Sequence, residues 1–275
     1  MEIKVLGQLS VSVRGRSVVP QDGESRRVLA LLALSADQVV PTSSIIQELW
    51  PEGPPRSADS RLRSHVDAVR GLLSDALRTG GGGAQATGAD LLISTPGGYR
   101  LDSRGGPLDA RQFERDTGAG YRALAGGYLR RAAVRLRDAL SLWTGDALAE
   151  LEQTGPLRVQ TSRLQEARMA ALEQWAAVEL QLGHHRERLA ELGELTARHR
   201  THQGLHRHYM TALHLCGRPA EALRVYERLT DTLAREGGPG PSLQLLRLRR
   251  RILAVPTGPG CTAKEICRPR LATTG

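Results

Sequence analysis

The sequence predicts a mainly α-helical chain in two parts, an α+β part at the N-terminus and an all-helical part after it. Residues 2–13 alternate apolar and polar side chains, which is typical of strands, and three segments with helical periodicity follow them. From residue 108 to residue 253 the periodicity is helical almost throughout. Gly183 and Gly217 end similar segments of this second part and are 34 residues apart, which is the tetratricopeptide period.

Composition and charge limit the classes of function. The 275 residues suffice for two domains, and 40% hydrophobic residues support buried cores. Residues 103–275 hold 27 basic and 18 acidic side chains, which accounts for the net charge of +9, whereas residues 1–102 hold 11 of each. No apolar run approaches the roughly 20 residues of a membrane span. Residues 1–20 form a strand pattern and not a signal peptide. We therefore expect a cytoplasmic, nucleoid-associated protein without a membrane partner.

The N-terminal part begins with strands and two helices. Residues 2–13 form a hairpin pattern, and residues 24–34 change to a helical period with nearly continuous apolar content. Thr42 or Ser43 is expected to be the N-cap of a second helix, because both are good N-cap residues. It ends before Pro51, where a proline-rich stretch begins. The second helix is therefore short, and a loop follows it.

The third predicted helix, residues 57–73, has two very different faces. Leu62, Val66, Val69 and Leu73 recur at helical spacing and make one face apolar. A helix that enters the major groove of DNA needs short side chains near the bases and arginine at its flanks. The opposite face fits that need, although an ordinary surface helix is an equally good interpretation of this segment alone. That face carries Ser57, Ser60, Arg61, Ser64, Asp67 and Ala68.

A second hairpin follows this helix. Residues 91–93 and 99–101 predict two strands, and Pro96-Gly97-Gly98 predicts the tight turn between them. A hairpin after a groove helix makes a winged helix-turn-helix, whose wing tip can reach the neighbouring minor groove. The candidate DNA contacts are polar and basic residues of the second helix, the third helix and the hairpin. They are Thr42, Ser43, Ser57, Ser60, Arg61, Arg63, Ser64, His65, Arg70, Thr95 and Arg100.

Changes in composition indicate the domain boundaries. The stretch Ser-Arg-Gly-Gly-Pro at residues 103–107 predicts a short linker. It separates a winged-helix domain, residues 1–102, from a helical domain, residues 108–255. Residues 256–275 are rich in Pro, Gly and Thr and predict a disordered tail.

The helical domain contains a repeat. The segments that end at Gly183 and Gly217 each precede a polar turn and another amphipathic helix, and an earlier copy is expected at Gly127. Helix pairs of this kind stack to bury their apolar faces and leave a concave surface for a partner. The sequence therefore predicts a tetratricopeptide-like helical-repeat domain.

Taken together, these segments resemble a known family over nearly the whole chain. Residues 1–102 resemble an OmpR-type winged helix, and residues 108–253 resemble the bacterial transcriptional activation domain. Both together are similar to the Streptomyces antibiotic regulatory proteins. No single motif is specific, but their order and spacing are. The matching stretches are Arg27–Leu34, Glu48–Trp50, Ser57-Ala58, His65-Val66, Pro96–Leu101, Leu108-Asp109 with Phe113, Ala139–Trp143 with Gly145, Gly217-Arg218 with Glu221–Leu223, and Gly240-Pro241 with Leu243.

The resemblance implies a transcriptional activator of a secondary-metabolite (antibiotic) gene cluster. Such proteins bind double-stranded DNA at tandem direct repeats upstream of a promoter, often as a homodimer, and contact RNA polymerase holoenzyme. The loop between the second and third helices faces the polymerase in the resembling families, so Trp50, Glu52 and Arg56 are candidates for that contact. No receiver domain precedes the winged helix, so the phosphorylation input of response regulators is not expected.

The sequence departs from the family pattern at three positions of the DNA-binding part. Two positions after His65 that are often basic are Asp67 and Ala68 here, and a common wing arginine is replaced by Thr95. Asp67 is expected to orient a neighbouring arginine at helical spacing, to accept from a cytosine amino group, or to be a solvated helix charge. Each departure removes positive charge from the expected interface.

Other chemistry finds little support. His202 and His206 are one helical turn apart, but no third or fourth metal ligand accompanies them. The sequence has neither a phosphate-binding glycine loop nor a nucleophile elbow, so we expect no enzyme activity, no metal and no cofactor. One alternative stays open because residues 1–102 have no net charge. It is a helical-repeat scaffold with a degenerate winged helix.

Overall fold

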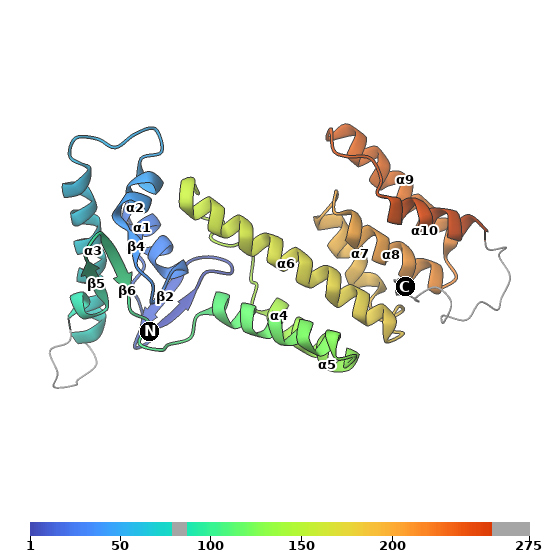
Figure 1. The fold of residues 1–275 in the computed structure, drawn as a ribbon, viewed down its shortest axis with the longest axis horizontal. Coiled ribbons are helices and arrows are strands. Elements are labelled where there is room, and N and C mark those ends of the chain that lie inside the picture. Colours follow the sequence, from blue (N-terminus) through green and yellow to red (C-terminus); the bar gives the residue numbers. More distant parts are fainter. Residues whose placement is uncertain (79–86, 255–275) are drawn as a thin grey trace, which may run out of the picture. The chain divides into compact units, whose positions relative to one another are not determined.

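The computed structural model describes residues 1–78 and 87–254 (Figure 1). The chain divides into two compact units. Unit 1 comprises Met1–Gly118 and Asp138–Met169, and unit 2 comprises Ala119–Arg137 and the chain from Ala170 onward. The disordered tail that the sequence predicts at residues 256–275 lies outside the described residues.

Two small antiparallel sheets belong to unit 1. In the first sheet, the strands β1 (Glu2–Lys4), β2 (Ser10–Val13) and β3 (Arg16–Ser17) lie in the order β1-β2-β3. In the second sheet, β4 (Val40–Pro41), β5 (Leu92–Thr95) and β6 (Gly98–Leu101) lie in the order β4-β6-β5, with Ser94 opposite Tyr99. Strands β5 and β6 are the wing hairpin that the sequence predicts.

Three helices complete the winged helix-turn-helix. They are α1 (Gly23–Leu34), α2 (Thr42–Leu49) and α3 (Ala58–Arg78). The side chain of Asp22 caps α1, because its Oδ2 accepts a hydrogen bond from the amide of Ser25 at 2.8 Å. The prediction placed the end of α3 at residue 73, but the helix continues for five more residues, because Ala76 adds another buried turn. The predicted fold class, a winged helix-turn-helix in a mainly α-helical chain, is confirmed.

The remaining chain is helical. Short connections that contain Gly127, Gly183 and Gly217 join several of its helices. Within unit 2, α8 and α9 share a core with α10, in which Ala222 and Tyr226 are buried. The helices are α4 (Asp109–Ala125), α5 (Leu129–Ser141), α6 (Gly155–Gln181), α7 (Leu189–Arg198), α8 (Gln203–Leu215), α9 (Pro219–Arg235) and α10 (Leu243–Ala254).

The repeat glycines end their helices in the same way. Gly183 and Gly217 have φ values of 87° and 74°, a left-handed conformation that favours glycine. In both cases the glycine amide donates to the carbonyl three residues earlier, and the next amide donates to the carbonyl five residues earlier. This pair of bonds is a Schellman motif, which satisfies carbonyls at the end of a helix. Gly127 makes the same two bonds, so the predicted earlier copy has the same turn.

A set of contacts joins β1 and the loop after it to much later parts of unit 1. The carboxylate of Asp109 accepts hydrogen bonds from the amides of Val5 and Leu6 at 2.9 and 3.0 Å. The amides of Thr144 and Leu148 donate to the carbonyls of Leu6 and Gly7 at 2.9 and 2.7 Å. We call these contacts the N-terminal junction. Because residues from 109 to 148 supply its partners, the winged helix is continuous with the first part of the helical region.

Segment 103–107, predicted as a linker, is part of this packing. The carbonyl of Pro107 accepts a hydrogen bond from the amide of Ile3 at 2.9 Å. Ser103 is fully buried, and its amide and hydroxyl donate to the carboxylate of Asp37 at 2.7 and 2.8 Å. Arg111 donates to the same carboxylate. The division into folding domains at this segment stays a prediction. The segment itself is hydrogen-bonded to Asp37 at its first residue and to Ile3 at its last.

Candidate nucleic-acid interface

Helix α3 presents the two faces that its sequence predicts. Leu62, Val66, Val69 and Leu73 are at most 1% exposed and belong to the core of unit 1. A face without bulky side chains lets a duplex approach the helix backbone closely. The residues opposite the core are all exposed, along the helix and at its start. They are Ser57, Ser60, Arg61, Ser64, Asp67 and Ala68.

Arg61 is oriented by a carboxylate and an aromatic ring. Its Nη2 lies 3.1 Å from Oε2 of Glu24, in the first turn of α1. Its guanidinium carbon lies 5.3 Å from the centre of the Trp50 ring, within cation–π range. A partly exposed ion pair contributes only about 0–1 kcal/mol to stability. A phosphate or a guanine edge can therefore replace Glu24 as the partner of Arg61 at little cost.

His65 points toward helix α1. Its Nε2 lies 2.8 Å from Oε2 of Glu24, and its Nδ1 lies 3.0 Å from Oγ of Ser25. The side chain is only 16% exposed. His65 therefore joins α3 to α1, and its role as a DNA contact stays a prediction.

Arg70 fastens the wing to helix α3. Its Nε and Nη2 donate to the carbonyl of Leu92 at 3.0 and 2.9 Å, and Nη2 also donates to Oγ of Ser94 at 2.8 Å. The carboxylate of Asp67 accepts a hydrogen bond from Nη1 of Arg70 at 3.3 Å. Of the three roles expected for Asp67, the structure therefore shows the orientation of a neighbouring arginine. Gly88 lets the segment before β5 lie against the backbone of α3, because a Cβ at Gly88 would collide with the backbone carbonyl of Arg70. Arg70 thus determines where the wing lies.

Two other predicted cations have no such partner. Within residues 1–78 and 87–254, no ion pair or side-chain hydrogen bond engages Arg63 or Arg100. Arg63 is exposed on α3, and Arg100 is half-buried on β6. Both guanidinium groups are available to a phosphate or a base edge.

Three of the six predicted hydroxyl contacts have their hydroxyl bonded to nearby backbone. The hydroxyls of Ser60 and Ser64 donate to the carbonyls of Ser57 and Ser60 at 2.9 and 3.1 Å. Thr95 donates its hydroxyl to the carbonyl of Gly98 at 3.1 Å and so closes the wing turn. The N-cap of α2 is Pro41 and not Thr42 or Ser43 as predicted, because the helix already begins at Thr42. Half-buried Thr42 and exposed Ser43 lie in its first turn, and the amide of Thr42 donates to the carbonyl of Gly97 at 2.9 Å.

The loop between α2 and α3 is exposed beside this face. Glu52 and Arg56 project into solvent, and neither side chain has a partner among the described residues. Trp50 is half-buried under Arg61. The loop therefore offers one aromatic and two charged side chains at the surface of unit 1.

A buried carboxylate joins this region to helix α6. Glu48 is 1% exposed, and its Oε2 accepts a hydrogen bond from the amide of Leu157 at 2.8 Å. Its Oε1 accepts from the amide and the hydroxyl of Thr154, both at 3.0 Å. Amides in the first turn of a helix have no partner within the helix, so Glu48 supplies the cap that α6 needs.

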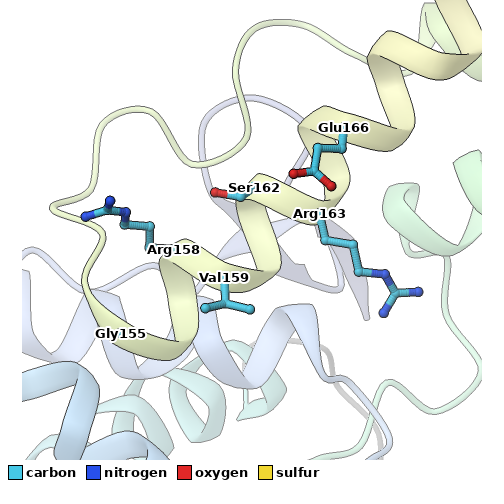
Figure 2. Close-up of a pocket in the computed structure, with 6 residues that line it drawn as sticks. All are labelled: Gly155, Arg158, Val159, Ser162, Arg163 and Glu166. Atoms are coloured by element: carbon cyan, nitrogen blue, oxygen red, sulfur yellow. The ribbon is translucent and has the colours of Figure 1, made fainter.

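A hollow of about 540 Å³ lies on the first turns of α6, close to this cap (Figure 2). Arg158, Val159 and Arg163 line it, and Val159 is 69% exposed. An added Cβ at Gly155 would lie 3.6 Å from the Gln47 side chain, so the hollow begins beside the end of α2. It gives unit 1 an exposed apolar side chain with two basic neighbours and the acidic Glu166 near the α2–α3 loop.

Comparison with known proteins identifies the family. A family model described as "Bacterial transcriptional activator domain" matches residues 108–253. The chain belongs to this family. The regulatory protein DnrI of Streptomyces peucetius is 38% identical over 258 residues, which cover 94% of each protein. The resemblance to the Streptomyces antibiotic regulatory proteins is confirmed, and the bacterial transcriptional activator domain follows a winged helix in this chain.

Other relatives of this activator-domain protein are longer. The regulatory protein AfsR of Streptomyces coelicolor is 33% identical over 251 residues, which cover 90% of this chain and 24% of AfsR. A solved structure of Mycobacterium tuberculosis EmbR, in complex with a low-affinity phosphopeptide, superposes with a TM-score of 0.76 at 30% identity. It covers 92% of this chain and 64% of the EmbR chain. The relatives are named regulatory or transcriptional regulatory proteins, so the chain is a member of a family of transcriptional regulators.

The histidines that suggested a metal have structural roles. Nδ1 of His202 accepts a hydrogen bond from the amide of Leu205 at 3.2 Å and caps α8, while Nδ1 of His206 lies 3.0 Å from the carbonyl of His202. In the part of the chain that the structure describes, no group of three or more metal-ligating side chains comes together. No helix of that part is long and apolar enough to cross a membrane.

Two residues of the interface were not among the predicted contacts. Glu24 holds both Arg61 and His65, and Glu48 caps a helix that begins 107 residues later in the chain. In the sequence, each looks like an ordinary acidic residue of a helix. For Glu48 a usable signal existed, because it is the first residue of the matching stretch Glu48–Trp50.

Proposed function

We propose that this protein is a sequence-specific DNA-binding transcriptional activator of a secondary-metabolite (antibiotic) gene cluster. It acts in the cytoplasm, at the nucleoid, and it has no enzyme activity. The observation that carries the proposal is the exposed, short-side-chain face of α3 beside a wing that Arg70 holds in place. The similarity to DnrI over 94% of both proteins supports the same function.

In this proposal α3 enters the major groove and the wing reaches the next minor groove. Arg61 and Arg63 are the arginines nearest the bases, whereas Arg100 contacts phosphate from the wing. Arg70 acts mainly by positioning the wing, because Leu92 and Ser94 already occupy its donors. Two protomers bind tandem direct repeats side by side, which adds affinity through multivalency.

Contact with RNA polymerase holoenzyme is assigned to the loop between α2 and α3. Trp50, Glu52 and Arg56 supply an aromatic ring and both signs of charge. The hollow at Val159 on α6 extends this surface, because Glu48 holds the start of α6 against the end of α2.

The DNA-binding proposal is tested with the full chain and a labelled duplex from the DNA upstream of neighbouring genes. If Arg61 reads a base, Arg61→Ala costs about 1–3 kcal/mol and relaxes selectivity at one base pair. Glu24→Gln releases Arg61 from its carboxylate and is expected to strengthen binding. Asp138→Asn is the matched control, because it removes one negative charge of unit 1 elsewhere.

The results separate the possible roles. Weaker binding by Glu24→Gln would mean that the pair with Arg61 supports the fold and does not compete with DNA. Failure of the intact chain to bind any upstream duplex would favour the helical-repeat scaffold.

The polymerase contact and the homodimer are tested separately. Glu52→Ala and Arg56→Ala should lower transcription by purified polymerase while leaving DNA affinity unchanged. Sedimentation of the protein on one repeat and on two repeats tests the homodimer.

A further inference from the structure

Unit 2 contains a pocket that the proposed DNA and polymerase contacts do not use. Its volume is about 420 Å³, and residues of α7, α8, α9 and the turn after α7 line it. Arg200, Arg228 and Arg235 contribute three guanidinium groups to its lining. A volume of this size falls within the range of small-ligand and side-chain binding pockets.

The donors of this pocket lack acidic partners. Within the described ranges, Arg200 and Arg228 have no ion pair or side-chain hydrogen bond, and neither has the hydroxyl of Tyr209. Arg235 donates only to the uncharged carbonyl of Asp231 at 3.2 Å and to the Thr232 hydroxyl at 3.5 Å. Three positive charges are thus collected at one cavity without neutralisation.

Some other arginines of unit 2 are neutralised by glutamate. Four of them lie within 3.1 Å of a glutamate, namely Arg137 with Glu191, Arg188 with Glu179, Arg207 with Glu173 and Arg218 with Glu221. Only one carboxylate, that of Asp231, lines the pocket. The unit as a whole, counted to residue 254, carries 18 arginines against nine carboxylates. Its field therefore attracts anions, and the pocket concentrates this attraction.

The shape and floor of the pocket favour a protruding ligand group. Val225 and Leu229 supply an apolar floor, and Gly193 lies opposite Tyr209. A Cβ at Gly193 would stand 3.3 Å from the Tyr209 hydroxyl, so the glycine keeps that hydroxyl accessible. Arg200, Arg228 and Arg235 are exposed, so a carboxylate can reach their guanidinium groups while a neighbouring apolar side chain of the same ligand enters the cavity.

We propose that this pocket binds an acidic peptide segment of a protein partner. The guanidinium groups of Arg200 and Arg228 hold carboxylates through paired N–H···O bonds, which match the carboxylate geometry better than a lysine does. An apolar side chain of the segment contacts the half-buried ring of Tyr209, above the buried Val225 and Leu229. The site lies between helices of a repeat array, the kind of surface that such arrays use for partners.

The test uses the full chain and a fluorescent peptide of alternating glutamate and leucine, read by anisotropy. A peptide with glutamine in place of glutamate is the ligand control. The double variant Arg200→Gln/Arg228→Gln is expected to weaken binding at least about tenfold. The control, Arg247→Gln/Arg250→Gln, removes the same charge from exposed positions on α10 outside the pocket, and is expected to change binding less than about twofold. Far-ultraviolet circular dichroism, which reports helix content, verifies that each variant is folded.

A third variant is expected to change peptide affinity in the opposite direction. Asp231→Asn removes the only carboxylate of the lining, so it is expected to strengthen peptide binding, which damage to the fold would not do. Equal weakening by the two double variants would overturn the proposal, because it would show diffuse attraction by unit 2. Absence of peptide binding would also overturn the proposal. So would a competition experiment in which inorganic phosphate or nonspecific duplex DNA displaces the labelled peptide as readily as unlabelled peptide does.

Discussion

Replacing Glu48 tests whether the winged helix and α6 are held together by a buried cap. Glu48→Ala removes the acceptor of two backbone amides and one hydroxyl, all in or next to the first turn of α6. A hydrogen bond to a charged group contributes about 1.5–3 kcal/mol, and a buried amide without a partner carries a further penalty. Part of this loss is offset, because the carboxylate no longer has to be buried. We expect a net destabilisation of unit 1 by about 2–4 kcal/mol.

Amide hydrogen exchange reports this change at the site itself. The amide of Leu157 is expected to exchange about 30-fold faster or more in Glu48→Ala, since 1.4 kcal/mol corresponds to a factor of ten. Glu48→Gln is expected to fall between the two proteins, because its amide oxygen can accept one bond while its NH₂ group faces another donor. Glu52→Ala is the matched control, because that glutamate is exposed and lacks a partner in the described chain. A loss below about 1 kcal/mol for Glu48→Ala would refute the reasoning.

Three further predictions concern stability. Gly88→Ala should lower the melting temperature, at a cost of about 1–3 kcal/mol, because its Cβ collides with the backbone of α3. Gly71→Ala, where an added Cβ meets nothing, should raise the melting temperature by the helix propensity of alanine, and equal effects of the two would contradict this account. Burial opposes ionisation of Asp37, but hydrogen bonds led by that from Arg111 hold its pKa below the usual value. The stability that Asp37 contributes is therefore present above its unfolded pKa and falls as pH drops through the folded pKa, and Asp37→Ala should remove this dependence in urea unfolding. Burial lowers the pKa of His208 to about 3, so between about pH 6.5 and 3 the unfolded chain binds the extra proton. Stability should fall with falling pH by up to about 1.4 kcal/mol per unit from this group, and an unchanged slope in His208→Gln would show that its burial is not the cause.

The faces of α3 could be predicted from the sequence because they depend on periodicity within one helix. Leu62 and Val66 are buried for the same reason that they recur at helical spacing. The roles of Arg61 and Arg70 could not be predicted in this way. Their partners, Glu24 and the carbonyl of Leu92, come from elements 37 and 22 residues away, and only the folded arrangement brings them close.

The candidate pocket of unit 2 shows a different limit. Arg200 and Arg228 are separated by a helix and a turn, and each is one of many arginines in a basic half of the chain. What distinguishes them is that the packing of α7, α8 and α9 brings both to the lining of one cavity. Sequence patterns report where an arginine lies along a helix, but they do not report whether its charge is neutralised.

The N-terminal junction constrains the order in which the protein can mature during synthesis. Val5, Leu6 and Gly7, which follow β1, leave the ribosome early, yet Asp109, Thr144 and Leu148, which complete their hydrogen bonds, are translated more than 100 residues later. At typical elongation rates this delay is on the order of ten seconds. During that time Val5 and Leu6, which are buried in the folded protein, lack these partners. A nascent chain that stops after the wing hairpin therefore lacks these bonds, and we expect it to be degraded rather than to occupy operators as a competitor.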